Sequence, residues 1–514
     1  MKLPLNGAKS AEPSLLAASI NCMAFSSLVL AATLWSMTMG APTTPTANAA
    51  LEISSTLDDD QDLRERMIVR AFSAAQYQKA LRLVDEYLAI WPETPHMHYN
   101  RACAFALLGR RDAAGEALLE AVKNGFQDFE TMRRDPDLAS MRNHETFTAI
   151  LEAKERVVAD ANDGRMNAFK DRYDQGYVQE KDNERKLMVA TGLGGRAHAE
   201  MMEMIGRQSD EQAKNLFPKA RLDWCFVLVP TEKDAPEVFK KELNVDDPRR
   251  TPGVYLHGRR LLVSRDIGAS MRHEFTHRMH WADMETRGQR HPMWIQEGLA
   301  SLYEDYEWRP DGSVRFVPNI RHNIARKQVE AQIDLPFEKL FLLDPDSFLA
   351  GNARYYPQAR SIFEFLADLG LLAEWYSRYC ETFNRDPSGA KAFEKVFGLP
   401  IDDVNGRWKR WVRDRGRIDD RIEPGDASIG IKGVDAGDGI RIESVVGLQA
   451  RRAGLRRGDV IMRIDGRSVR AQSELVVEIA SREVGEIVRL EVRRGSSVRM
   501  VEVRLEPLGS RARD

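Results

Sequence analysis

Two histidines four residues apart, with a glutamate directly after the first, constrain this chain more than any other feature. In His273-Glu274-Phe275-Thr276-His277 both imidazoles project from one face of a predicted helix, about a turn apart. At this spacing the two rings can hold one zinc ion, and Glu274 can reach a water molecule at the metal. The segment therefore predicts a metal-binding helix that needs a further ligand from elsewhere.

A candidate for that ligand lies 20 residues after His277, in a second predicted helix whose first turns carry Glu297. The segment from His291 to Ala300 resembles the gluzincin superfamily of zinc peptidases, where the third ligand stands in a Trp-x-x-Glu-Gly-x-Ala context. The resemblance implies that His273, His277 and Glu297 bind one Zn²⁺ and that Glu274 is the general base. Such a ligand set leaves one position open for water, which favours a catalytic zinc over a structural one.

The metzincin family of zinc peptidases is an alternative that fits less well. It needs glycine three residues after the second histidine and a ligand three residues later, and these positions hold His280 and Asp283. Without the glycine, the chain lacks the tight turn that would bring Asp283 to the metal. His280 lies on nearly the same helix face as His273, and we expect it to pack or to support a ligand.

Strands are predicted directly before the metal-binding helix. Residues 253–255 and 261–263 read as a strand pair, and Asp266 is a good N-cap for the helix that follows. The gluzincin resemblance implies that this pair holds the edge strand that aligns an extended substrate by backbone hydrogen bonds.

Two further features concern catalysis: a tyrosine near the oxyanion and a carboxylate that supports a ligand histidine. The segment Tyr356-Pro357-Gln358 resembles the Tyr-x-Gln segment of bacterial gluzincin-like proteins, which implies that Tyr356, or Tyr355 in its place, donates to the oxyanion. An aromatic that only anchors a helix start is the alternative. Ser301 stands where several gluzincins carry a carboxylate that orients a ligand histidine, and Glu304 or Asp305 could replace it.

The region before this domain has a helical pattern with a 34-residue period. Ala80 lies 34 residues before Ala114, and the surrounding residues resemble tetratricopeptide repeats. Two units are fewer than usually fold alone, so residues 125–147 are expected to supply a capping helix pair. The repeats would bind a partner peptide in a groove or serve as a spacer.

The last eighty residues change to a strand pattern after a polar linker. Residues 427–508 closely resemble a bacterial PDZ domain. The resemblance implies a loop that captures a terminal carboxylate, and a side-chain pocket on the following helix. The residues concerned are Ile429, Gly430 and Ile431 in the loop, and Leu475 and Ile479 in the pocket. Packing within the chain is the other possible use of such a domain.

The first 49 residues read as an export signal. Lys2 and Lys9 precede an apolar stretch from Leu15 to Trp35, and Ala47-Asn48-Ala49 is a small-x-small pattern for cleavage before Ala50. An uncleaved membrane anchor is the alternative. We therefore expect the protein in the periplasm, at the cell surface or outside the cell.

The balance of charged residues limits the kinds of partner that we expect. The 75 Lys+Arg and 78 Asp+Glu nearly balance, which argues against a nucleic-acid binder. Four scattered cysteines are too few for a disulfide framework and are expected to be buried.

Taken together, these patterns predict a multidomain α+β protein that acts as a zinc peptidase on exported proteins. The predicted parts are a signal or anchor (1–49), tetratricopeptide-like helical repeats (50–160), a gluzincin-like α+β domain (161–415), a linker (416–426) and a small β-rich PDZ domain (427–508). The alternatives are a catalytically silent scaffold that works through its two binding modules, and a zinc hydrolase that acts on a non-protein amide.

Overall fold

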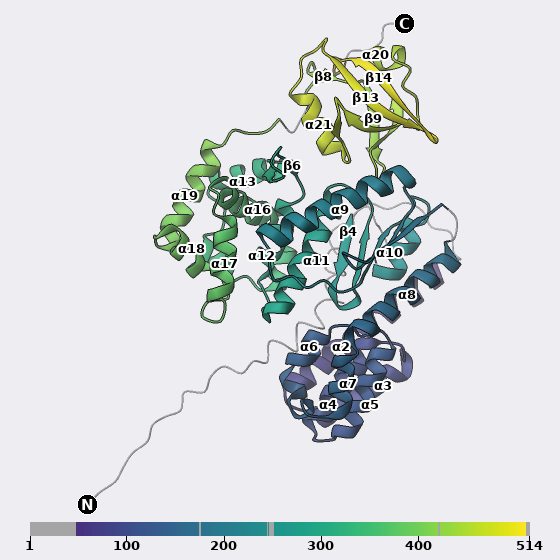
Figure 1. The fold of residues 1–514 in the computed structure, drawn as a ribbon, viewed down its shortest axis with the longest axis vertical. Helices are drawn as coiled ribbons and strands as arrows, with labels where there is room; N and C mark the ends of the chain where they lie inside the picture. Colours follow the sequence, from purple (N-terminus) through teal and green to yellow (C-terminus); the bar gives the residue numbers. More distant parts are fainter. Residues whose placement is uncertain (1–47, 174–175, 244, 246–250, 420–421, 510–514) are drawn as a thin grey trace, which may run out of the picture. The chain divides into compact units, whose positions relative to one another are not determined.

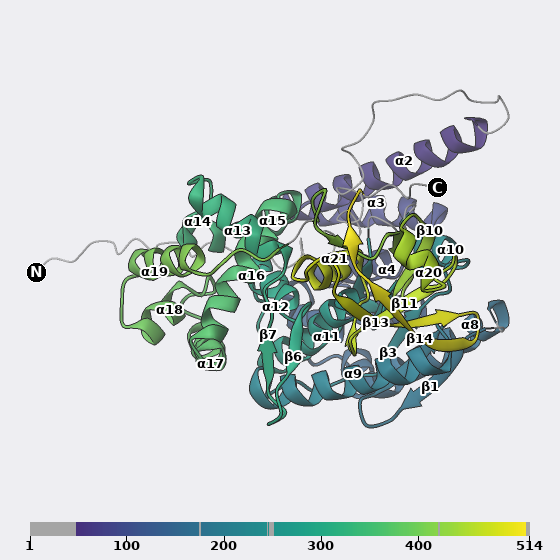
Figure 2. The same ribbon diagram turned by 90° about the horizontal axis from the view of Figure 1, so that it is seen from above.

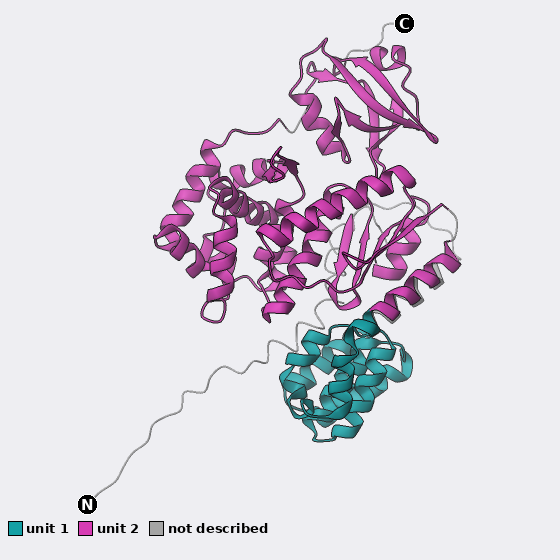
Figure 3. Cartoon of the chain, in the orientation of Figure 1, with its two compact units in different colours: residues 1–158 teal, residues 159–514 magenta. Residues whose placement is uncertain are grey.

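The computed structural model describes residues 48–173, 176–243, 245, 251–419 and 422–509. The chain forms two compact units, residues 1–158 and 159–514, and is of mixed α+β type (Figures 1 and 3). Nearly all of the predicted export signal lies outside the described residues. Among the residues that are described, none of the helices combines the length and hydropathy needed to cross a bilayer.

The first unit is helical throughout its described part. The alanines one predicted period apart, Ala80 and Ala114, are both fully buried, as small residues are where helices cross closely. The predicted capping segment forms two short helices and the start of a third, and the tetratricopeptide assignment itself stays a prediction. The elements are α2 (Asn48–Ser73), α3 (Tyr77–Ile90), α4 (Pro95–Leu107), α5 (Arg111–Lys123), α6 (Phe129–Arg134), the 3₁₀ helix η1 (Pro136–Met141) and α7 (Glu145–Glu152).

Helix α8 (Lys154–Arg172) leads into the second unit, which begins with a five-stranded mixed sheet. Its order is β1-β2-β3-β5-β4; β2, β3 and β5 are parallel, and β1 and β4 run antiparallel at the two edges. Strands β2 and β3 are buried at every residue, as expected for parallel strands covered on both faces. The elements are β1 (Val178–Asp182), β2 (Leu187–Thr191), α9 (Gly195–Asn215), β3 (Cys225–Val229), α10 (Ala235–Leu243), β4 (Gly253–Leu256), η2 (His257–Arg259) and β5 (Leu261–Ser264).

The predicted strand pair is thus the β4–β5 hairpin, and it delivers the chain to the central helix α11 (Ala269–Arg287). The N-cap of this helix is Gly268 and not Asp266 as predicted. Asp266 supports the helix start from two residues upstream, since its Oδ1 accepts from the backbone N–H groups of Gly268 (2.8 Å) and Ser270 (3.3 Å). Gly288, with φ of 70°, ends the helix in the left-handed region. Helix α12 (Met293–Leu302) follows and packs against α11.

A hairpin and several helices complete this domain. Figures 1 and 2 both show α13 and α16–α19 gathered on the side of α11 and α12 that lies away from the sheet. One apolar core runs from the sheet through α11 and α12 into these helices. The cysteines within the described residues are buried, as expected. The elements are β6 (Tyr306–Trp308), β7 (Val314–Phe316), α13 (Ile320–Glu330), α14 (Phe337–Phe341), α15 (Pro345–Ala350), α16 (Asn352–Asp368), α17 (Leu372–Thr382), α18 (Ala390–Phe397) and α19 (Ile401–Asp414).

The C-terminal part is β-rich and has a core of its own. Its main sheet has the order β14-β13-β11-β10-β9, with β12 paired to β11, so β9 is an edge strand. The elements are β8 (Ala427–Ser428), β9 (Ile431–Asp435), β10 (Ile440–Val445), α20 (Leu448–Arg452), β11 (Val460–Ile464), β12 (Arg467–Ser468), α21 (Gln472–Ala480), β13 (Ile487–Arg494), β14 (Ser497–Arg504) and β15 (Glu506–Pro507).

Candidate metal centre

The three predicted ligands meet at one point between α11 and α12. His273 Nε2 lies 3.1 Å from His277 Nε2 and 3.3 Å from Glu297 Oε2, and His277 Nε2 lies 3.6 Å from the same carboxylate oxygen. The two rings are steeply inclined, at 76°. Two nitrogens and one oxygen therefore form a nearly equilateral triangle.

The size of this triangle fits a zinc ion. Bonds of about 2.0–2.1 Å at tetrahedral angles place ligand atoms roughly 3.3 Å apart. Imidazole nitrogen and carboxylate oxygen are also the donors of catalytic zinc sites, which keep a position open. Although burial acts to raise it, the two histidines hold the pKa of Glu297 well below its usual range, so the carboxylate is ionised.

A glutamate and an arginine support the first ligand from behind. Glu304 Oε1 lies 3.1 Å from His273 Nδ1, and Arg321 on α13 donates to both oxygens of Glu304 at 2.8 and 2.9 Å. An Nδ1–H that donates to Glu304 leaves the Nε2 lone pair free for a metal. Of the two candidates in the sequence, Glu304 takes this place, while Asp305 accepts from Asn319 at 2.6 Å.

The predicted base, Glu274, lies outside the triangle, against the edge strand of the sheet. Its Oε2 accepts from the backbone N–H of Tyr255 on β4 at 2.8 Å. A Cβ at Gly253 would lie 2.9 Å from Glu274 Cγ, so the absence of a side chain there makes room for the base. Burial, together with the charge of Glu297, raises the pKa of Glu274 above its usual value despite the nearby histidines.

Tyr356, the predicted oxyanion donor, interacts with Glu297. Burial and a hydrogen bond with Glu297 raise the pKa of Tyr356 well above its usual value, which keeps its hydroxyl protonated. The guanidinium carbon of Arg321 lies 5.7 Å from its ring centroid. The alternative residue, Tyr355, packs instead against Gly351 and Phe348 at the start of α16.

A close helix crossing brings α16 to α12 and so Tyr356 to Glu297. A Cβ at Gly298 would lie 2.6 Å from the Phe363 ring and 3.1 Å from the Ala359 carbonyl, so only glycine fits the contact as it stands. The fully buried Arg360 ties the same two helices together by donating to the Ser301 carbonyl at 2.9 Å.

The residues of the metzincin alternative point elsewhere. Asp283 accepts from the Lys219 backbone (2.9 Å), from Arg287 (2.5 Å) and from the Tyr376 hydroxyl (2.9 Å). His280 packs in the interior, as expected, with Nε2 2.8 Å from His291 Nδ1. Neither residue belongs to the ligand group formed by the described residues around His273.

A second group of potential ligands occurs in the first unit and has a structural explanation. Cys103, Asp135 and Asp137 offer ligand atoms close together. However, Asp135 caps η1 through the Asp137 N–H (2.9 Å) and also accepts from the Tyr99 hydroxyl (2.6 Å). These hydrogen bonds account for the acidic group without an ion.

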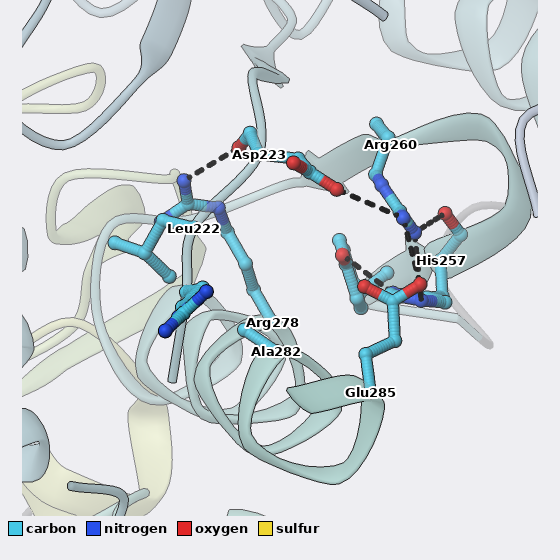
Figure 4. Close-up of a pocket in the computed structure, with 9 residues that line it drawn as sticks. Leu222, Asp223, His257, Arg260, Arg278, Ala282 and Glu285 are labelled. Atoms are coloured by element: carbon cyan, nitrogen blue, oxygen red, sulfur yellow. Dashed lines mark hydrogen bonds and ion pairs between the residues drawn. The ribbon is translucent and has the colours of Figure 1, made fainter. Parts of the chain in front are cut away.

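A polar pocket farther along α11 has its own internal pairing. Figure 4 shows Arg260 between Asp223 and Glu285, with salt-bridge distances of 3.1 and 2.9 Å. His257 lies 3.0 Å from Glu285 as well. This network joins the end of the β4–β5 hairpin to α11 and so stabilises the helix that carries the metal ligands.

The predicted peptide-binding residues occupy two kinds of position in the C-terminal domain. Ile429 and Ile479 are enclosed in its core, with 3% and 1% of their surface exposed. Gly430, with φ of 80°, forms the turn before β9, and Ile431 begins that strand. Leu475 is partly buried at the edge of the core, so of the two predicted pocket residues it offers the surface that a ligand could contact.

Sequence reasoning missed two residues of the metal centre. Arg321 lies 17 residues after Glu304 on another helix, and no local motif marks it. Gly253 was noticed only as a strand residue. A glycine at the start of an otherwise apolar strand is the signal that could have indicated a close approach at this position.

Comparison with known proteins identifies the C-terminal domain. Residues 427–505 match the PDZ domain family. A curated relative, a chloroplastic protein from Arabidopsis thaliana, is 33% identical over 115 residues. That match covers 22% of this chain, and the chain spans about a third of the relative's length.

Two solved structures show weak similarity. A serine endoprotease from Yersinia pestis aligns with 21% of this chain and 36% of its own, at 20% identity and a TM-score of 0.15. An aminopeptidase N family protein from Idiomarina loihiensis aligns with 64% of this chain and 67% of its own, at 13% identity and a TM-score of 0.28. At these scores neither similarity indicates a shared activity.

Proposed function

We propose that this chain is an exported zinc-dependent peptidase of the gluzincin type, whose PDZ domain recruits the carboxyl termini of protein substrates. The observation that carries the proposal is the triangle of His273, His277 and Glu297 atoms, 3.1 to 3.6 Å apart. A buried carboxylate that is not part of the triangle, Glu274, lies beside it, as a general base must.

The residues of the chain then have distinct roles. When bound, Zn²⁺ would polarise the scissile carbonyl as a Lewis acid and lower the pKa of water. Glu274 takes a proton from the attacking water and delivers it to the leaving amine, and its raised pKa suits this exchange near neutral pH. Tyr356 donates its hydroxyl to the oxyanion. The outer edge of β4 holds the substrate backbone by strand pairing through the groups that Glu274 leaves open, since the Tyr255 N–H already donates to Glu274.

A single substitution tests this proposal. In Glu274→Gln we expect full zinc content and a loss of casein and peptide-library cleavage by about 10²–10⁴-fold, since general-base catalysis contributes on that order. Zinc is measured by atomic emission on the purified protein. The matched control is Glu307→Gln, which changes an exposed glutamate paired with Arg315 and leaves cleavage unchanged.

Other outcomes favour the alternatives. A parent protein that binds zinc but cleaves none of these substrates supports the silent scaffold, which would act through its helical-repeat and PDZ modules. Hydrolysis of small amides without cleavage of casein or peptides supports a hydrolase that acts on a non-protein amide. A parent protein that binds no zinc contradicts both metal-dependent functions.

A further inference from the structure

The edge strand of the PDZ domain fixes the direction in which a bound chain would run. Strand β9 pairs with β10 on one side and ends its sheet within the described part of the chain. The loop that can capture a carboxylate, Ile429–Ile431, lies at the start of β9. A polypeptide held there by its carboxyl terminus therefore extends along β9 toward Asp435, and its upstream residues leave at that end.

The far end of β9 lies against the start of the metal-binding helix. The Asp435 carboxylate accepts from the backbone N–H of Gln472 (2.8 Å), which joins the end of β9 to the first turn of α21. Two residues after Asp435, the Gly437 carbonyl accepts from the Ile267 N–H (3.1 Å), directly before α11. Upstream residues of a bound chain therefore emerge beside the helix that carries His273 and His277.

Partly exposed ion pairs join the two sides of this contact. Arg470 packs on Gly268, because a Cβ added at Gly268 would lie 2.5 Å from the Arg470 Cβ. The Arg470 guanidinium donates to Glu200 of α9 at 2.6 Å. Arg463 reaches the same glutamate at 3.1 Å. Arg272, the residue before His273, lies 3.5 Å from Glu474 on α21. Several charge-assisted contacts between the same elements restrict their relative orientation.

The contact at Gly437 also lies near β4, an edge strand of the five-stranded sheet. A Cβ at Gly437 would lie 2.9 Å from the Arg265 carbonyl, and the Arg265 N–H donates to the Pro252 carbonyl at 2.8 Å. Pro252 directly precedes β4, whose first residue, Gly253, adjoins Glu274. Gly437, two residues after β9, and Pro252, directly before β4, thus both contact Arg265, the residue that follows β5.

We propose that the outer edges of β9 and β4 form one substrate track, which binds an extended polypeptide antiparallel to both strands with its free carboxyl terminus at Ile429–Ile431. The proposal rests on the proposed peptidase function and adds where on such a substrate the cut falls. At about 3.3 Å per residue, β9, the crossing and the start of β4 place the cut roughly eight to twelve residues from that terminus.

The reaction on this track is an ordinary peptide hydrolysis. The oxygen of water bonds to the carbonyl carbon beside Glu274, the C–N bond breaks, and the water proton passes through Glu274 to the leaving nitrogen. The products are the shortened protein, with a new carboxylate, and a short carboxyl-terminal peptide that is held by the PDZ domain.

The first test measures where peptides are cut. Two random-sequence libraries, of about 20 and about 30 residues, both end in a free valine and exceed the length of the track. We expect cuts, mapped by mass spectrometry, to cluster at one distance from the carboxyl terminus in both libraries. Amidated copies should be cut at least about tenfold more slowly, because the tethered carboxylate raises the local concentration of substrate. Cuts that ignore the terminus, with no effect of amidation, overturn the track.

A binding measurement decides the track even without cleavage. Valine-terminated peptides carrying a benzophenone amino acid at successive positions are cross-linked to Glu274→Gln. Positions near the terminus should attach to β9 or α21, and positions roughly eight to twelve residues upstream to β4 or α11. Upstream labels that attach elsewhere, or equally from amidated peptides, contradict the track. Loss of cleavage in every library contradicts the peptidase function alone, since this measurement does not depend on it.

A matched pair of variants tests the contact between the two strands. Arg470→Ala removes the link to Glu200, and we expect the cut positions to scatter while fluorescence anisotropy still detects binding of the free-acid peptide. Arg467→Ala, which removes an exposed pair with Glu478 inside the PDZ domain, should leave the cut distance unchanged. An unchanged cut distance in Arg470→Ala contradicts the role of this contact.

Discussion

Helix α11 contributes to two histidine pairs, one partly buried and one fully buried, that differ in their neighbours. His273 and His277 lie among carboxylates, whereas His280 pairs with His291 among aromatic rings, including Phe217 and Tyr376. The two pairs have similar nitrogen–nitrogen distances, 3.1 and 2.8 Å. The spacing of the rings alone therefore does not distinguish a metal site from a core.

The carboxylates make the difference. Burial acts to lower the pKa of His273, but Glu297, Glu304 and Glu274 together raise it to about 10. Burial and the charges of Arg287 and Arg290 lower the pKa of His291 to about 3, and burial likewise lowers that of His280. One pair attracts a cation and the other excludes it. In this protein the histidine pair that can hold a cation is the one with carboxylates beside it.

Removing the carboxylate ligand Glu297 should lower the zinc affinity of the site more than the other substitutions. In Glu297→Gln we expect zinc affinity to fall by roughly 10²–10³-fold, because the ~10–16 kcal/mol of a four-ligand site corresponds to about 3 kcal/mol per ligand. Competition with a chromophoric chelator measures this. The matched variant His291→Gln changes the aromatic pair and should keep the affinity of the parent. Equal losses in both variants would show that the two pairs are not distinguished in this way.

A smaller effect is expected from the residue behind the first ligand. Glu304→Gln keeps the shape of the side chain but removes the charge that orients His273, and outer partners of this kind contribute about 10–100-fold in metal affinity. The same chelator competition gives the value, and Glu307→Gln is the exposed control. A zinc affinity in Glu304→Gln equal to that of the parent would mean that packing alone orients His273.

Local geometry explains which parts of this site could be predicted from sequence. Helical spacing alone places His273 and His277 on one face, and the family resemblance supplied Glu297, Glu274 and Tyr356. Arg321 could not be found, because its contact with Glu304 depends on how α13 packs.

The same distinction holds for the fold. The β4–β5 hairpin follows from adjacent residues and is present as predicted, and Asp266 bonds to the start of α11 although the N-cap is Gly268. Ile479 has the spacing of a pocket residue, but its burial depends on strands that lie before and after it in sequence. The contact between Arg470 and Glu200 joins residues 270 apart, and no periodicity indicates it.

The raised pKa of His273 predicts a pH dependence of zinc binding. With a pKa of about 10 in the metal-free protein, His273 holds a proton that zinc must displace at any lower pH. Affinity should therefore rise with pH, by about tenfold per unit between pH 7 and 9 for this one proton. Chelator competition at several pH values gives the slope. His291→Gln should preserve the slope, and Glu304→Gln should flatten it; a slope near zero in the parent would contradict the assignment of that proton.

The lowered pKa of His291 in the aromatic pair predicts a smaller effect, on the stability of the fold rather than on zinc binding. Because the folded-state pKa of His291, about 3, lies below the unfolded value near 6.5, the unfolded chain binds the extra proton and stability is lost as the pH falls through this range. Between pH 7 and 5.5 this one group should remove roughly 1 kcal/mol from the free energy of unfolding. Urea denaturation of the parent and of His291→Gln at the two pH values measures the difference, which should be smaller in the variant. An equal loss in both proteins would mean that other groups cause the loss of stability at acid pH, and that protonation of His291 does not contribute to it.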